Sequence, residues 1–254
     1  MQNYKMTVAY DGTDFYGWQV QPDKISICST LQDCFLGVFK KKVKILGASR
    51  TDTGVHALGQ VASFKTDLQI EPENLTKIWN DNLPKSILIK KIEKVSDNFK
   101  PLVGVKQKTY YYHLFLKRPK PFVARYGWYY EFIDLVDLKK LKKALHFYIG
   151  EHDFKSFCKI EKGEKRDPVK IIDSIKVDNK SEFFHSEDIL KITIKGKSFL
   201  RYQIRRMIGY ALDVARRPEI PVNYIKNLLD NPNTKQKLLK ADSMGLCLGE
   251  IIYE

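Results

Sequence analysis

The residues best suited to chemistry lie in Gly47–Gln60, which reads GASRTDTGVHALGQ. Arg50 and Asp52 stand two positions apart there, among serine, threonine and glycine residues that favour a turn over a packed core. A neighbouring guanidinium keeps a carboxyl group ionised, and an ionised, positioned carboxylate can act as a nucleophile or as a base. The residues alone leave a second interpretation open, in which Asp52 caps a turn and forms a surface ion pair with Arg50.

Aromatic residues mark two further segments. Asp11–Gln19 (DGTDFYGWQ) places three aromatic side chains in one loop, which suits stacking on exposed bases and equally suits a turn with the rings packed beneath it. It is not a calcium loop, because Pro22 stands where the twelfth-position glutamate is needed. Tyr110 lies in a predicted strand, and alternation puts it on one face with Tyr112. That face either lines a site or fills a core.

Phe199–Gly209 (FLRYQIRRMIG) predicts an amphipathic helix with a cationic cluster. Its apolar stripe consists of Leu200, Ile204, Met207 and Ile208. Arginines on the outer face of such a helix would contact phosphate or aid solubility. Arg205 lies close to the stripe, where a buried guanidinium needs a carboxylate partner.

The sequence lacks the residues that a zinc site, a nucleotide-driven reaction or a serine hydrolase would need. His56 follows Asp52 by four residues, but no second cluster of ligands accompanies it, so we expect no zinc site. The sequence contains no P-loop, no GxGxxG and no GxSxG motif, which argues against nucleotide-driven and serine-hydrolase mechanisms.

Charge and composition narrow the class of partner. The 254 residues carry a net charge of +14, which favours a polyanion such as nucleic acid or an anionic membrane surface. Residues 1–104 hold 14 Lys and Arg against 11 Asp and Glu, whereas residues 105–254 hold 30 against 19. There is no signal peptide, no apolar run of membrane-spanning length and no CxxC pair, so we expect a soluble, cytoplasmic chain without a cofactor.

The elements around these residues predict a mixed fold. In the first half, the expected order is β-α-β-β-α-β, as in a ferredoxin-like unit, with strands at 4–10, 43–48, 59–65 and 87–95. The first helix should begin at a capping box of Ser29 and Gln32, and the second should cover 72–81. Leu75, Ile78 and Trp79 should point inward from this second helix.

The second half roughly repeats this order of elements. The predicted strands are 106–116, 169–178, 189–195 and 245–252, and the predicted helices are 137–149, 200–216 and 221–229. Pro101 and Gly104 interrupt the pattern between the halves. We therefore predict an α+β protein with an N-terminal half, 1–104, that carries the Asp52 loop. A basic C-terminal half, 105–254, would carry Tyr110 and Arg205.

Together these segments resemble the tRNA pseudouridine synthases of the A type nearly from end to end. The resemblance rests on YDGTDFYGWQ, SRTDTGVHALGQ, the aromatic strand at Tyr110, GEHDF, FLRYQIRRMIG and ADSMGLCLGEIIY. It implies two ferredoxin-like halves that share a long mixed or antiparallel sheet, with helices on one side and an active-site cleft between the halves. It also implies a homodimer that needs no cofactor or metal.

The resemblance assigns roles to four residues. Asp52 matches the catalytic aspartate of the family, and Arg50 matches the arginine that displaces or holds the target nucleotide. Tyr110 matches the tyrosine that packs against the uracil, and Arg205 matches the arginine that pairs with the catalytic carboxylate. The implied activity is the isomerisation of uridine to pseudouridine at nucleotides 38–40, in the anticodon stem-loop of tRNA.

The sequence also departs from the family pattern. Leu102 stands where the family often has an arginine, and Lys106, Gln107 and Lys108 replace an arginine-rich segment, which weakens bidentate recognition of phosphate. Two alternatives therefore stay open. One is a synthase acting on another RNA, such as ribosomal RNA. The other is a non-catalytic RNA-binding protein on the same platform.

Overall fold

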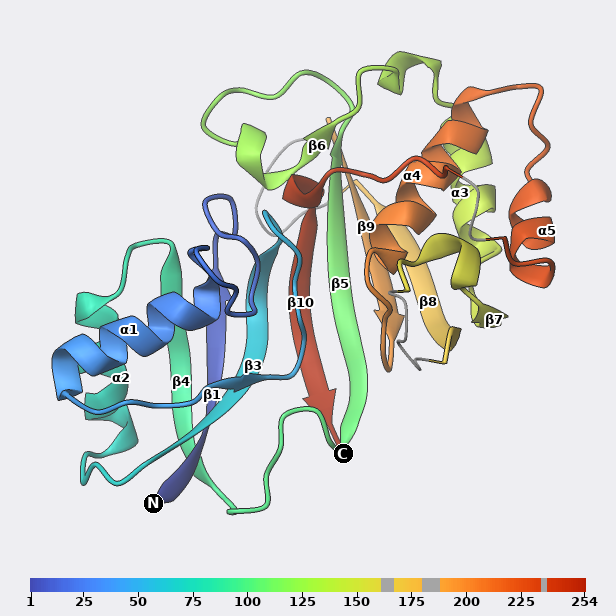
Figure 1. The fold of residues 1–254 in the computed structure, drawn as a ribbon. Helices are drawn as coiled ribbons and strands as arrows, with labels where there is room; N and C mark the ends of the chain where they lie inside the picture. The colour runs from blue at the N-terminus through green and yellow to red at the C-terminus, as the bar shows by residue number, and fades with distance from the viewer. Residues whose placement is uncertain (161–166, 180–187, 234–236) are drawn as a thin grey trace. The chain divides into compact units, whose positions relative to one another are not determined.

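The protein is described here by a computed structural model covering residues 1–160, 167–179, 188–233 and 237–254 (Figure 1). These residues contain ten β-strands and five α-helices, so the predicted α+β class is confirmed. They divide into two compact units. The first unit comprises Met1–Lys108 together with Cys247–Glu254, and the second comprises Thr109–Leu246.

The first unit has the predicted ferredoxin-like order of elements. They are β1 (Gln2–Tyr10), α1 (Ile27–Phe39), β2 (Leu46–Gly47), β3 (His56–Thr66), α2 (Pro72–Asn82) and β4 (Ile87–Val95). β1 lies between β3 and β4 and is antiparallel to both. The last strand, β10 (Leu246–Tyr253), adds to the other side of β3 in parallel, with Cys247 opposite His56 (Figure 1). The sheet is therefore mixed.

Aromatic side chains fill the core of the first unit. Tyr4 of β1 stacks on Phe64 of β3 with ring centroids 5.3 Å apart. Phe35 from α1 and Trp79 from α2 both contact that same Phe64 ring edge-on. Both helices thus cover one face of the sheet, as expected. Each of these rings is at most 2% exposed, and burying such a side chain stabilises the fold by roughly 1.5–3 kcal/mol.

Two local predictions about the helices are wrong. The N-cap of α1 is Ser26, whose side chain accepts from the Ser29 amide, while the Ser29 hydroxyl reaches back to the Ser26 amide. Ser29 is therefore the N3 residue that closes the capping box and not the N-cap that opens it. In α2, Leu75 and Trp79 are buried as expected, but Ile78 is 36% exposed because the helix turns it toward solvent.

The second unit contains the remaining strands and helices. They are the continuation of β5 (Val105–Phe115), β6 (Trp128–Tyr129), α3 (Leu138–His146), β7 (Gly150–Asp153), β8 (Val169–Asp178), β9 (Ile189–Gly196), α4 (Gln203–Arg216) and α5 (Tyr224–Asp230). Its strands hydrogen-bond in the order β5-β9-β8-β7, with the short β6 parallel to β5. The Asp137 side chain caps α3 by accepting from the Lys139 and Lys140 amides.

α4 forms much of the core of the second unit. It packs against α3, and nearly all of its side chains are buried, including the predicted stripe of Ile204, Met207 and Ile208. Phe157 links this helix to the chain after α3, since its ring contacts both Tyr148 and Tyr210. α4 starts at Gln203, three residues later than the pattern predicts.

The division between the units differs from the one expected between residues 104 and 105. Residues 105–108 belong to the first unit, as does the C-terminal strand from Cys247 onward. Hydrogen bonds tie the chain end to residues just before β5: the Tyr253 hydroxyl donates to the Pro101 carbonyl, and the Glu254 amide donates to the Gly104 carbonyl. Among the described residues, no helix combines the length and the apolar character needed to cross a membrane.

Candidate active site

The Asp52 carboxylate lies in the loop between β2 and β3 of the first unit. Within this loop Arg50 is exposed, Thr51 is buried and Asp52 is half-buried. A half-buried aspartate is partly shielded from water and partly accessible from it. Its usefulness for catalysis depends on how firmly the loop is held.

Hydrogen bonds from β3 hold the start of the Asp52 loop. The fully buried side-chain amide of Gln60 forms a reciprocal pair with the Ser49 backbone: its Oε1 accepts from the Ser49 amide at 3.2 Å, and its Nε2 donates to the Ser49 carbonyl at 2.7 Å. The Ala48 amide donates to the Val61 carbonyl. Residues 48 and 49 therefore have little freedom to move relative to the strand.

Tyr10 at the end of β1 and the DGTDFYGWQ loop that follows it hold the rest of the Asp52 loop. The Tyr10 hydroxyl lies 2.7 Å from the Thr51 hydroxyl, and the Trp18 amide donates to the Thr51 carbonyl at 3.1 Å. The Gly54 amide donates to the Phe15 carbonyl. Phe15 and Trp18 are buried, so two of the three loop aromatics serve as supports. Contacts on both sides of Asp52 thus fix the backbone that carries its carboxylate.

Gly17 lies where these two loops pass close to each other. Its φ is +81°, and a Cβ added there would lie 2.5 Å from the Thr51 carbonyl oxygen. We expect Gly17→Ala to lower the free energy of unfolding by about 1–3 kcal/mol and to lower any turnover that depends on Asp52. Gly37→Ala is the matched control. It lies in α1 with nothing within 4 Å of the added Cβ, and should leave turnover unchanged and stability equal or higher by up to about 1 kcal/mol. Equal effects of the two substitutions would contradict the inference that Gly17 lets the two loops pack against each other.

His56 and Asp11 form a polar pair beneath the loop. His56 Nδ1 lies 3.1 Å from the Gly12 amide and 3.2 Å from Asp11 Oδ1. Burial raises the pKa of Asp11, but hydrogen bonds from His56 and Thr13 lower it by more, so the carboxyl group stays ionised far below neutral pH. His56 thus supports the loop through Asp11 and Gly12. In the described ranges, no three His, Cys, Asp or Glu residues gather as metal ligands would.

Lys108 is a support that the sequence pattern did not reveal. The pattern placed it in a cationic segment facing phosphate, but only Lys106 of that segment is exposed. Lys108 is buried, and its Nζ donates to the Ala48 carbonyl at 2.7 Å, at the start of the Asp52 loop. Burial lowers the pKa of this amine from its ordinary 10.5 to about 8.

This pKa shift predicts how stability depends on pH. Between pH 8 and pH 10.5 the folded chain has released the Lys108 proton while the unfolded chain still holds it, so the free energy of unfolding rises with pH. We expect the wild-type value minus that of Lys108→Met to rise by up to about 3 kcal/mol over this range. Urea denaturation at a series of pH values measures both. A difference that stays flat or falls would contradict the burial of a charged amine.

Tyr110 lies on β5, two residues after Lys108, at the start of the second unit. Its ring is 6% exposed and meets the Phe199 ring edge-on, with centroids 5.2 Å apart. Tyr112, on the same face, is fully buried, and its hydroxyl donates to the Asp242 carbonyl. Burial, together with the Asp242 carboxylate, raises the pKa of Tyr112 well above its ordinary value. The face predicted for Tyr110 is thus largely a packed one.

Arg205 lies in the first turn of α4, as a buried guanidinium. Its Nε donates to the Ala241 carbonyl at 2.9 Å, and the Ala241 amide donates back to the Arg205 carbonyl. The residue before the helix, Tyr202, has a φ of +65°, which is costly for a side chain of this size. Arg201 and Lys240 lie over the Tyr202 ring, at 5.1 and 4.5 Å. The start of α4 thus gathers cations around one aromatic ring.

Comparison with known proteins decides the family. The family model described as tRNA pseudouridine synthase matches residues 6–101 and 144–254. The chain belongs to this family. The matched stretches include the Asp52 loop and the start of α4 with Arg205, whereas Tyr110 lies between them.

Full-length relatives carry the family name. The tRNA pseudouridine synthase A of Thermodesulfovibrio yellowstonii is 33% identical over 259 residues, and the tRNA pseudouridine synthase A 2 of Clostridium perfringens is 34% identical over 253 residues; each match covers all of both chains. The tRNA pseudouridine synthase A 1 of Protochlamydia amoebophila is 35% identical over 258 residues, covering 100% of this chain and 97% of the relative. A chain in the crystal structure of a Cbf5–Nop10–Gar1 complex is 11% identical, with a TM-score of 0.33 over 82% of this chain and 54% of that one. That similarity is too weak to support a shared fold.

The family residues fall into two groups in the structure. Arg50 and Asp52 lie in one loop of the first unit, and Tyr110 and Arg205 lie in the second unit. Sequence reasoning singled out all four but missed the supports Gln60 and Lys108. Gln60 could have been found as a polar residue in β3 shortly after the loop. Lys108 stands among other polar residues of β5, so its local sequence does not distinguish it.

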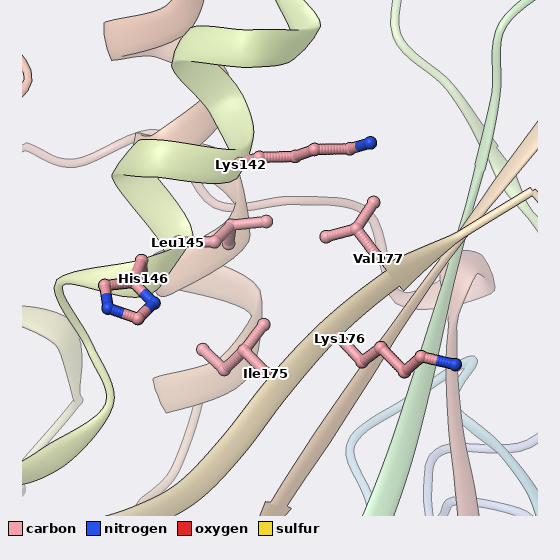
Figure 2. Close-up of a pocket in the computed structure, with 6 residues that line it drawn as sticks. All are labelled: Lys142, Leu145, His146, Ile175, Lys176 and Val177. Carbon is pink, nitrogen blue, oxygen red and sulfur yellow. The ribbon is translucent and has the colours of Figure 1, made fainter.

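One surface hollow contains none of these residues. It measures about 240 Å³ and lies between α3 and β8 of the second unit (Figure 2). Its lining residues are Lys142, Leu145, His146, Ile175, Lys176 and Val177. Figure 2 shows both lysine side chains extending away from the His146 ring, and Lys176 is paired with Asp178 at 3.0 Å. The hollow therefore has no convergent polar groups of the kind a substrate site needs.

Proposed function

We propose that this protein isomerises uridine to pseudouridine in the anticodon stem-loop of tRNA, at nucleotides 38–40. The observation that carries the proposal is the intact SRTDTGVHALGQ loop within the family match, with Asp52 at its centre. The hydrogen bonds from Gln60, Trp18 and Tyr10 support it, because they preorganise the backbone around that carboxylate.

The reaction needs only groups that the side chains can supply. The N1–C1′ bond of uridine breaks, the base turns, a C5–C1′ bond forms, and the C5 proton moves to solvent while N1 gains one. Substrate and product are isomers, so no oxidant, reductant or net water is consumed. A positioned carboxylate with an arginine partner and an aromatic surface for the base is a sufficient set.

In this proposal each residue has one task. Asp52 either attacks C1′ or removes a sugar proton, and Arg205 keeps that carboxylate ionised and oriented. Tyr110 stacks on the uracil while it turns, and Arg50 holds the displaced nucleotide. The target base must first leave its stack, which costs a few kcal/mol and least for a nucleotide in a loop.

Charge supports tRNA as the polyanion. Residues 105–254 carry a net +11 of the total +14, so phosphate contacts from this half would supply binding energy that weakens as salt rises. As the resemblance implies, we further propose a homodimer that acts in the cytoplasm without a cofactor.

Tritium release tests the reaction directly. The purified protein is incubated with a tRNA transcript labelled with tritium at C5 of uracil, because the isomerisation expels the hydrogen from C5. We expect release to match the pseudouridine found at nucleotides 38–40 by sequencing. Tight binding without tritium release would support the non-catalytic alternative and overturn the proposal.

One observation favours a second candidate, a synthase acting on ribosomal RNA. Leu102 replaces a frequent family arginine, and its side chain is 69% exposed, so a surface cation is lost there. Mapping pseudouridines in total RNA from a strain lacking the protein separates the two. Loss at the tRNA anticodon arm supports the first candidate, whereas loss only in ribosomal RNA supports the second.

A further inference from the structure

The loop of residues 117–125 carries a concentration of positive charge that the proposed chemistry does not use. No acidic residue occurs between Asp97 and Glu131, so this stretch of chain is uniformly basic. The exposed cations of the loop are Lys117, Arg118, Lys120 and Arg125. The loop also lies outside the two stretches that match the family model.

An aromatic side chain projects from the same loop. Phe122 is 89% exposed, the highest value among the large hydrophobic residues that the structure describes. A single exposed apolar residue needs no explanation by itself. The surroundings of Phe122 are unusual, because its phenyl ring lies between Lys120 and Arg125 along the chain. An RNA strand offers bases that can stack on the ring and phosphates that can bind the cations.

The loop is held in place rather than left free. At its start the Leu116 amide donates to the Asp188 carbonyl, and Lys117 pairs with the Asp188 carboxylate at 2.9 Å. At its end β6 pairs with β5, with Trp128 opposite Leu114. These anchors fix both ends of the loop.

The chain around Phe122 is restricted as well. A turn encloses Phe122, in which the Val123 amide donates to the Lys120 carbonyl. A second turn follows directly, in which the Tyr126 amide donates to the Val123 carbonyl. Pro119 and Pro121 fix φ on either side of Lys120. A ring presented on such a preorganised loop loses little entropy when it binds.

We propose that the 117–125 loop is an RNA-binding element in which Phe122 stacks on an unpaired base while Arg118 and Lys120 contact phosphates. The proposal rests on the proposed function, which supplies the RNA. Charge favours RNA over a second copy of the chain, since a second copy would bring another +14 and the same basic loop. The element would add affinity for tRNA without taking part in the chemical step.

Three substitutions test the stacking. Phe122→Ala should raise the Kd and KM for tRNA by about tenfold to a hundredfold and leave kcat unchanged, because a base loses its stacking partner. Phe122→Trp should bind at least as tightly as the wild type. Leu135→Ala is the matched control: Leu135 is another exposed apolar residue of the second unit, 64% exposed, but it lies between Asp134 and Asp137 and should have no effect.

Fluorescence and salt dependence read out the two kinds of contact separately. The added tryptophan fluorescence of Phe122→Trp, measured as the difference from the wild type, should be quenched by tRNA. A fully paired RNA duplex should quench it much less, because it offers no free base. Arg118→Ala and Lys120→Ala should each reduce the slope of log K against log salt by about 0.7–0.9.

Each remaining outcome is decisive. Wild-type affinity in Phe122→Ala, or a loss in kcat alone, would overturn the RNA-binding element. So would a change from dimer to monomer on substitution, since Phe122 would then contact a second copy. Binding is measured apart from turnover, so a wild-type protein that binds tRNA through Phe122 but makes no pseudouridine would refute the proposed function and leave this inference standing.

Discussion

Asp52→Asn is expected to lower pseudouridine formation in tRNA by about a thousandfold or more, with little change in tRNA affinity. The amide keeps the shape of the carboxylate but can neither attack C1′ nor accept a sugar proton. The hydrogen bonds of the Thr51 and Ser49 backbone, the Thr51 hydroxyl and the Gly54 amide do not involve the altered group, so they should still hold the loop after the substitution. Single-turnover formation of pseudouridine, with filter binding in parallel, measures both quantities.

Asp33→Asn provides the control for this substitution. Asp33 is an exposed aspartate on α1 of the same unit, so it reports the effect of removing one negative charge without touching the loop. We expect wild-type turnover from it. If Asp52→Asn also turned over normally, Asp52 would not be the catalytic carboxylate.

Arg205→Lys is expected to lower kcat by about a hundredfold while tRNA affinity falls only modestly. Arginine can donate from Nε to the Ala241 carbonyl and still offer its two terminal nitrogens to a carboxylate. Lysine keeps the positive charge but has a single nitrogen, so it cannot make both contacts in this way. Its flexible stem also loses the fixed geometry of the guanidinium. Separate measurement of kcat and Kd distinguishes an orienting role from a phosphate contact, which would lower binding and turnover alike.

Arg206→Lys is the matched control next in the chain. Arg206 is half-buried, and its guanidinium donates to the Cys158 carbonyl. The same substitution there should change stability slightly and leave kcat intact. A comparable drop in kcat for both variants would indicate that α4 tolerates no lysine near its first turn, and would remove the special role of Arg205.

The sequence predicted the elements best where side-chain periodicity was strong. The strands at 87–95 and 169–178 have the predicted bounds, because β4 alternates buried and exposed residues and β8 begins after a proline. The start of α1 was misplaced because Ser26, Ser29 and Thr30 lie close together and all can cap a helix. Only the backbone shows that the extended residue is Ser26.

The candidate site was predicted in part. Arg50 and Asp52 were found because turn-forming residues surround them, whereas Lys108 is 60 positions from the carbonyl it binds. Its burial depends on how β5 packs against that loop, and no local pattern encodes such a contact. The same applies to the pairing of β10 with β3, which joins segments nearly 200 positions apart in the sequence.

That pairing has a consequence for how the protein is made. While the ribosome is still translating the second unit, residues 1–108 have already emerged, but β3 still lacks its parallel neighbour. An unpaired, apolar strand edge invites association with other nascent chains. The first unit is thus completed only after residues 247–254 are synthesised, so β3 gains its parallel neighbour from a distant segment and not from the folding of its own sequence neighbours.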